Sequence, residues 1–339
     1  MLMGGDQLIS RGLESSRKFL EDQCEIQLEL GRNLTDSCLY TLPARQLVER
    51  ANDFEIRNLT IRERIEQNRV EYFFWPVIDH WAATPYLPCD PVTTLKNQRQ
   101  KKVPYMTGGN ANEGAFFTAP NWRYLKEEDN QVREFWDVFG GHLMFFKDFN
   151  QTYVEKLFNR MVAQFYFGGQ AGITRGNKDS FTAVTTDSYF THSNQQTVKL
   201  HALSAAPVYN YLLTYRGSVS LSFLFTPGDP EAQSEDFGVS HADDLLYTFK
   251  LELGKISALN TADDRKFAAN WISLISNFVK YGNPTPLSDG PTVWRPAQKS
   301  ERSEGYLDIN LENSEKLSMF PERIEFWNRV LYHKSIGLE

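Results

Sequence analysis

Residues 238–249 read GVSHADDLLYTF, and this stretch says more about the fold than any other part of the chain. It places the imidazole of His241 on a turn between a run that is expected to form a strand, residues 219–225, and an acidic start of a helix. Apolar residues at helical spacing follow the two aspartates. The stretch therefore predicts a histidine presented on a loop of a mixed α/β fold, where a general base is commonly found.

A carboxylate upstream occupies a similar position. Residues 103–107, VPYMT, predict a buried strand that breaks at Gly108 and Gly109 and presents Glu113 on the next loop. A loop acid followed by a loop histidine matches the order nucleophile, acid, base of an α/β-hydrolase. The 339 residues contain no G-x-S-x-G motif, the strained turn that exposes the nucleophile. We therefore expect an α/β-hydrolase fold that holds the acid and the base, with the C-terminal part of the sheet and its covering helices but not the N-terminal strands.

Further segments, in order along the chain, carry a resemblance to a known family. They are FWPVID at 74–79 with LPCDP at 87–91, PVYNYL at 207–212, NF at 277–278 with YGNPTP at 281–286, and YLDI at 306–309 with Arg323 and Trp327. Together they resemble the type-B carboxylesterase and cholinesterase family, and within it the insect carboxylesterases that include juvenile hormone esterase and venom esterases.

The resemblance implies hydrolysis of carboxylic esters by a Ser-His-Glu triad. His241 would take the proton of the serine hydroxyl, and Glu113 would hold the imidazole and stabilise the imidazolium. In the family the serine elbow lies upstream of the acid, at a spacing that puts it before Met1 here. We expect residues 1–339 to be one partial carboxylesterase domain, a fragment that is inactive alone, because the nucleophile and the backbone donors for the oxyanion are both missing.

In the family, the region between acid and base forms part of a lid over the acyl pocket. Five aromatic residues are pocket candidates by position, although most aromatics at such spacing pack in a core. They are Phe116, Phe117, Trp136, Phe145 and Phe146.

Cysteines and glycosylation motifs suggest a secreted glycoprotein. Cys24 and Cys38 resemble the short disulfide loop of the family, with two reduced thiols as the alternative, and Cys89 has no assigned partner. The first residues lack a charged region and an apolar region of a signal peptide, from which we expect that the true start is missing. Sequons stand at Asn33, Asn58 and Asn150.

Composition and motifs exclude several classes of function. The net charge of -7 argues against a nucleic-acid partner, and no apolar run is long enough for a transmembrane span. His80 adjoins Asp79 and is expected to be a structural or surface histidine. No carboxylate or cysteine stands at ligand spacing from His142, His192, His201 or His333, so no metal or cofactor is expected. The resemblance implies a small-molecule ester as the partner. Ser240 lacks the pair of flanking glycines of an elbow, since Gly238 precedes it but Ala242 follows it. Asp244 is expected to cap the next helix rather than to act as a second acid.

Other functions remain open. The chain is also compatible with a catalytically inactive adhesion member of the family, such as neuroligins, neurotactin or glutactin, or with an isoform or gene-model product that has no activity of its own. The intact pair Glu113 and His241 favours an active parent.

Helices are expected at 13–23, 41–51, 60–69, 121–164 (interrupted by Gly140 and Gly141), 195–206, 262–281 and 323–332.

Overall fold

The computed structural model of the chain describes only part of its length. The described residues are 42–54, 77–80, 82–126, 136, 140, 144, 153–169, 173–251, 257–287, 292–297 and 305–335. Several predictions fall outside them: the helices at 13–23 and 60–69, the pair Cys24 and Cys38, the sequons at Asn33, Asn58 and Asn150, and the pocket candidates Phe145 and Phe146.

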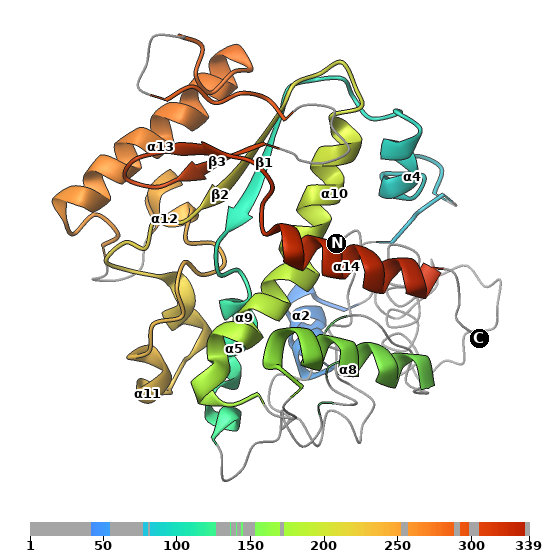
Figure 1. The fold of residues 1–339 in the computed structure, drawn as a ribbon, viewed down its shortest axis with the longest axis vertical. Coiled ribbons are helices and arrows are strands. Elements are labelled where there is room, and N and C mark those ends of the chain that lie inside the picture. The colour runs from blue at the N-terminus through green and yellow to red at the C-terminus, as the bar shows by residue number, and fades with distance from the viewer. Residues whose placement is uncertain are drawn as a thin grey trace.

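The described strands form a four-stranded sheet in the order β1-β2-β3-β4. Strands β1 (Tyr105–Asn110), β2 (Val208–Leu213) and β3 (Tyr306–Ile309) are parallel, and β4 (Ser314–Lys316) is antiparallel to β3. Helices lie on both sides of the strands (Figure 1), as expected where every face of a parallel sheet is buried. The arrangement is consistent with the α/β-hydrolase fold.

Strand β2 is buried at almost every position, which explains its nearly continuous apolar sequence, VYNYLL. Strand β1 differs from the expectation, because it runs through Gly108 and Gly109 instead of breaking there. The reason is a close approach between the strands: a Cβ on Gly108 would lie 2.4 Å from the ring and from the carbonyl oxygen of Tyr211. The glycine serves the packing of β1 against β2 rather than a turn.

The described part of the connection from β1 to β2 is mainly helical. The 15-residue helix α8 (Tyr153–Phe167) is the described part of the helical region expected at 121–164. The helix expected at 195–206 starts earlier and ends earlier, since helical turns run without a break from Lys178 to His201. The elements are α5 (Ala115–Asn121), the 3-10 helices η3 (Trp122–Leu125) and η5 (Arg175–Asn177), α8, α9 (Lys178–Thr186), the π-helix η6 (Asp187–Thr191) and α10 (His192–His201).

After β2, the expected strand at 219–225 was wrong, because residues Leu221–Phe225 form the 3-10 helix η7. The hydroxyl of Ser220 accepts a hydrogen bond from the amide of Ser222 and so caps the turn. By contrast, helix α13 (Ala262–Tyr281) has the bounds that the sequence predicted. The other elements are α2 (Ala44–Phe54), α4 (Pro91–Lys96), α11 (Pro230–Gln233), α12 (Leu245–Thr248) and α14 (Pro321–Ser335).

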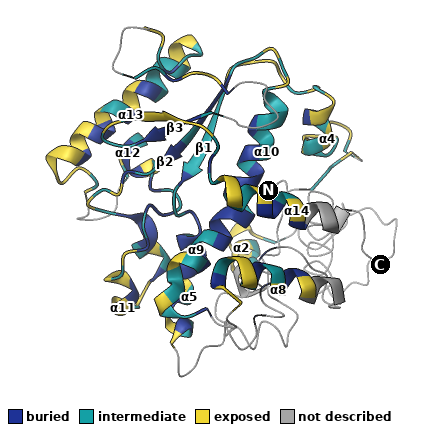
Figure 2. Cartoon of the chain, viewed as in Figure 1, coloured by how far each residue is buried: buried dark blue, intermediate teal, exposed yellow. Residues whose placement is uncertain are grey.

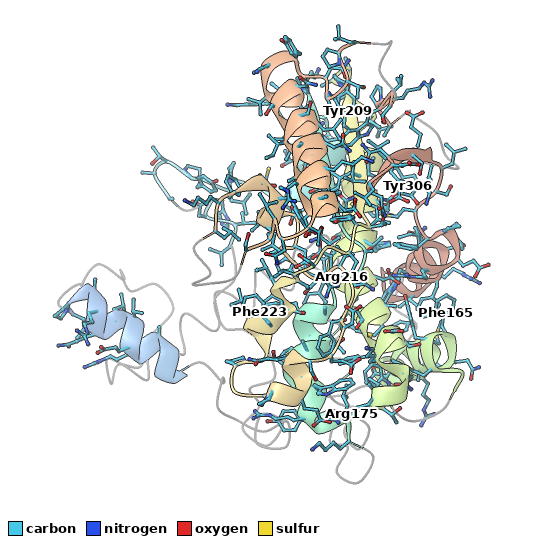
Figure 3. All side chains as sticks on the ribbon, turned by 90° about the vertical axis from the view of Figure 1, so that its left-hand side faces the viewer. Phe165, Arg175, Tyr209, Arg216, Phe223 and Tyr306 are labelled. Carbon is cyan, nitrogen blue, oxygen red and sulfur yellow. The ribbon has the colours of Figure 1, made fainter. Side chains whose placement is uncertain are left out.

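Two large apolar clusters hold the described elements together (Figure 2). One packs α13 against the sheet, with Phe267, Trp271 and Leu307 almost fully buried. The other joins the helices below the sheet and includes Phe181 and Trp327. In the side view of Figure 3 the sheet half carries the labels Tyr209 and Tyr306, and the helical half carries Arg175. The loops that hold Glu113 and His241 contact both halves: Gly114 donates to Thr186 of α9, and Val239 belongs to the cluster that packs against the sheet.

Candidate active site

Glu113 lies just beyond the carboxyl end of β1, the end at which parallel α/β sheets hold their sites. The amide of Asn110, the last residue of β1, donates to Oε1 of Glu113 at 2.7 Å. The amide of Gly114 donates to the hydroxyl of Thr186 at 2.9 Å. The acid is therefore fixed between the end of the strand and helix α9.

His241 lies on the loop before α12 and meets this carboxylate. Its Nδ1 donates to Oε2 of Glu113 at 2.5 Å. The side chain of Glu113 is 8% exposed and that of His241 is 40% exposed. The structure thus brings together the two residues that the sequence placed on separate loops, with the carboxylate buried and the imidazole partly open to solvent.

Glu113 and His241 each shift the pKa of the other. The hydrogen bond from Glu113 raises the pKa of the His241 imidazole, and burial opposes this rise only in part. Burial raises the pKa of the Glu113 carboxyl, while the bond to His241 acts in the opposite direction. A buried carboxylate that favours the imidazolium is what a general base needs when it takes up a proton.

The loops of the acid and the base are also joined through their backbones. The amide of Asn112 donates to the carbonyl of Val239 at 2.9 Å, and the amide of Val239 donates to Oδ1 of Asn112 at 3.0 Å. The side chain of Asn110 donates to the carbonyl of Ser240 at 2.8 Å. These bonds fix the distance between the segments that carry Glu113 and His241.

The aspartates after His241 have structural contacts. Asp243 accepts from the amide of Ser240 at 2.8 Å and from that of Leu221 at 2.6 Å, and burial raises its pKa to about 6. The cap predicted at Asp244 was wrong, since its side chain accepts no amide of α12. Its backbone is already helical, at φ -60° and ψ -29°, whereas a capping side chain needs an extended backbone. Oδ1 of Asp244 instead accepts from Nδ2 of Asn110 at 3.4 Å.

Aromatic rings lie against one side of the imidazole. The ring centroids of Phe116 and Phe190 lie 5.4 and 5.0 Å from that of His241, and Phe225 lies 4.9 Å from Phe116. Of the pocket candidates, Phe116 alone has a described ring contact with His241. Phe117 and Trp136 belong to the core, where they pack against Tyr189 and Phe167.

The sequence does not predict the place of Phe190 or Phe225 at the site. Phe190 lies on the π-helical turn η6, and Phe225 is the last residue of η7. Neither adjoins Glu113 or His241 in sequence, so no local pattern relates them to the site. The packing of α5 against η7 and against α9, which continues into η6, brings these rings together.

Comparison with known proteins identifies the family. The model of the carboxylesterase family matches residues 22–327 of the chain. The chain belongs to the carboxylesterase family.

Individual relatives are distant and longer. Juvenile hormone esterase of Tribolium castaneum is 27% identical over 270 residues, which are 78% of this chain and 44% of the relative. The carboxylic ester hydrolase of Bombus ignitus is 23% identical over 268 residues, 77% of this chain and 46% of the relative. Neuroligin-like protein glit-1 of Caenorhabditis elegans is 25% identical over 275 residues, 74% of this chain and 34% of the relative. The carboxylesterase-family chain therefore spans less than half the length of these relatives.

Other polar side chains of this carboxylesterase-family chain make contacts that indicate structural roles. Nε2 of His192 is 3.0 Å from Oδ1 of Asn328, and the ring of His201 stacks on Tyr105 at 4.5 Å. The thiol of Cys89 is free and lies 3.0 Å from the hydroxyl of Thr94. Ser240 is fully buried, which does not suit a nucleophile. Within the described ranges, no three potential metal ligands gather and no helix is long and apolar enough to cross a membrane.

Proposed function

We propose that His241 and Glu113 are the general base and the acid of a serine carboxylesterase, acting with a serine that is not found in an elbow motif within these 339 residues. The observation that carries the proposal is the 2.5 Å contact between Nδ1 of His241 and the buried carboxylate of Glu113. The contact leaves the other ring nitrogen for a hydroxyl. Membership of the carboxylesterase family supports the choice of reaction.

In this proposal, Nε2 of His241 removes the proton of the serine hydroxyl as its oxygen attacks the carbonyl carbon of the ester. The imidazolium is stabilised by Glu113 and returns the proton to the oxygen of the leaving alcohol when the tetrahedral intermediate breaks down. A water molecule then repeats the sequence on the acyl-enzyme: it gives a proton to His241 and its oxygen attacks, and the proton is returned to the serine as the acid leaves. Each proton that His241 takes is thus given back within the same half of the reaction.

The aromatic rings suggest the kind of ester. Phe116 and Phe190 contact the imidazole, and Phe225 continues this wall. Apolar and aromatic side chains favour an apolar group of a ligand, since its burial removes hydrocarbon from water. We propose that one side of the substrate, next to His241, is an apolar acyl or alcohol group.

A fluorophosphonate reagent tests the proposal, because it reacts with a serine that an adjacent base activates. The protein for this test joins these 339 residues to the coding segment that carries a G-x-S-x-G motif. We expect labelling of the parent and loss of most labelling in His241→Ala and Glu113→Gln. Equal labelling of all three proteins would contradict the proposed roles.

A second candidate is a protein that binds a partner without catalysis. The similarity to neuroligin-like protein glit-1 favours it, as does the missing elbow motif. The retained acid–base contact favours the esterase, since adhesion has no chemical need for it. A coding segment whose elbow has another residue in place of serine, together with no labelling by the reagent, would support the adhesion function.

We also propose that the protein is secreted and glycosylated. The support is the set of sequons at Asn33, Asn58 and Asn150. Expressed through a secretory pathway, the protein is expected to lose mass when an amidase removes N-linked glycans. The triple Asn→Gln variant is the control, and a parent whose mass does not change would contradict the proposal.

A further inference from the structure

Besides the bond from Asn110 to the carbonyl of Ser240, the loops of Glu113 and His241 are joined through Asn112. Its amide donates to the carbonyl of Val239 at 2.9 Å, and its Oδ1 accepts from the amide of Val239 at 3.0 Å. Asn112 also forms an isolated parallel bridge with Ser240. Asn112 immediately precedes the acid, and Val239 lies two residues before the base. The side chain of one residue therefore completes a two-bond connection between the segments of both groups.

The loop of the base is shaped to receive this side chain. Gly238 has a φ of +80°, a conformation that L-residues rarely adopt. A Cβ at Gly238 would lie 2.3 Å from Oδ1 of Asn112. The glycine thus provides both the backbone conformation and the space for the carboxamide, an observation independent of the hydrogen bonds.

The base needs such external support more than the acid does. Glu113 is buried and receives the amide of Asn110, whereas the side chain of His241 is 40% exposed. The residue after it, Ala242, has a positive φ of +68°, a strained conformation that the surroundings must maintain. The carboxylate of Asp243, which follows His241 in the chain, accepts from the amide of Ser240. Asn112 bonds to Val239, which precedes His241.

We propose that Asn112 is a positioning residue, whose bond to the amide of Val239 sets the distance between Nδ1 of His241 and the carboxylate of Glu113. Its effect on ester turnover rests on the proposed function. Its effect on the geometry of His241 does not, and is measurable in this chain as it stands.

The test is NMR of the chain labelled with ¹⁵N-histidine, in the parent, Asn112→Leu and Asn112→Asp. In the leucine variant we expect loss of the downfield Nδ1 proton signal of His241 and a lower pKa of its imidazole, because the bond to Glu113 raises that pKa. The amide proton of Val239 should exchange about fivefold faster, as follows from loss of one hydrogen bond. The aspartate variant keeps the acceptor oxygen and should retain the signal.

Asn277→Leu is the matched control. Its Nδ2 donates to the carbonyl of Pro284 at 3.2 Å, also in a partly buried setting, but on α13. It should lose thermal stability without changing the signal or the pKa of His241. A parent-like signal and pKa in Asn112→Leu would overturn the proposal, and so would equal changes in the control.

Further variants cover the case in which Asn112→Leu does not fold. Asn112→Ser removes the carboxamide with little change in packing, and Gly238→Ala displaces it by contact with Oδ1. Both should weaken the Nδ1 signal, and an unchanged signal in both would overturn the proposal. Loss of the signal in these variants, together with no reaction of the joined protein with esters or fluorophosphonates, would refute the proposed function alone.

Discussion

At the scale of single residues, the decisive feature is an imidazole that is held by a buried carboxylate. The bond to Glu113 raises the pKa of His241, so the imidazolium is more stable in the folded chain than in the unfolded chain. The stabilisation is fully present below the unfolded pKa of about 6.5 and is lost as the pH rises through the higher pKa of the folded state. The site thus binds a proton more readily than a free histidine does.

The first prediction concerns this titration. Glu113→Gln removes the negative charge but keeps the size of the side chain, so the pKa of His241 should fall below that of the parent. A titration of the ring signals of His241 by NMR measures the shift. His201, whose pKa is lowered by burial against Tyr105, is the internal control and should titrate identically in both proteins. An unchanged pKa of His241 would mean that the carboxylate does not act on the imidazole in solution.

Sequence alone predicted the pairing of Glu113 with His241 but not the residues around them. Glu113 and His241 follow from local signals, a strand before a loop and a loop before a helix. Phe190 and Phe225 reach the site only through the packing of separate elements, which no local pattern encodes. The apolar-polar alternation at 219–225 is typical of a strand, yet the cap from Ser220 and the bond between Asp243 and Leu221 produce a helical turn. Local side-chain bonds outweighed the pattern there.

At the scale of elements, the site depends on helices that pack unusually closely behind Glu113. A Cβ on Gly114 would lie 2.1 Å from the carbonyl of Thr182 and 2.7 Å from the amide of Thr186. These are backbone atoms of α9, so a side chain at position 114 would have to displace a whole helix.

Helix α13 was predicted with its bounds because its ends carry local signals, the capping box of Thr261 and Asp264 and the left-handed Gly282.

The second prediction is that Gly114→Ala destabilises the chain by about 1 to 3 kcal/mol, the usual effect of overpacking a rigid interior. Urea unfolding followed by tryptophan fluorescence measures the change. Gly176→Ala is the control, since its Cβ would meet its nearest neighbour, Thr174, at an ordinary 3.5 Å. Equal stability of the two variants would show that α5 and α9 are not in contact as described.

The third prediction concerns the attachment of α14. Asp187, fully buried on η6, accepts hydrogen bonds from Arg323 and, at 2.5 Å, from the hydroxyl of Tyr166. Arg323→Met would leave the carboxylate buried without its cation, which typically costs about 3 to 5 kcal/mol.

Arg329→Met is the control for this ion pair. Arg329 lies 3.8 Å from Glu325 and both side chains are more than 60% exposed, so its loss should change the unfolding free energy by less than about 0.5 kcal/mol. Similar losses in the two variants would contradict the buried ion pair.

At the scale of the whole molecule, β1 forms an edge of the described sheet, pairing with β2 alone among the described strands. Apolar side chains such as Val279 and Leu287 are 77% and 73% exposed. Strand edges and exposed apolar surface both favour association. The fourth prediction is that the purified chain forms oligomers, as measured by light scattering and sedimentation. A monodisperse monomer with a single cooperative unfolding transition would show that the chain is a self-sufficient domain.

The central claim is that Glu113 and His241 act as one catalytic unit with a serine from another segment. The most direct measurement is kcat/KM for p-nitrophenyl esters, in the 339-residue chain and in a protein that joins it to the serine-bearing segment. We expect the chain alone to show no turnover above that of its His241→Ala variant. In the joined protein, His241→Ala and Glu113→Gln should each lower kcat/KM by about a thousandfold or more, and the double variant should be little worse than either, because members of a triad act together. Saturable turnover by the chain alone that His241→Ala abolishes, or a Glu113→Gln protein within a few-fold of the parent, would contradict the account.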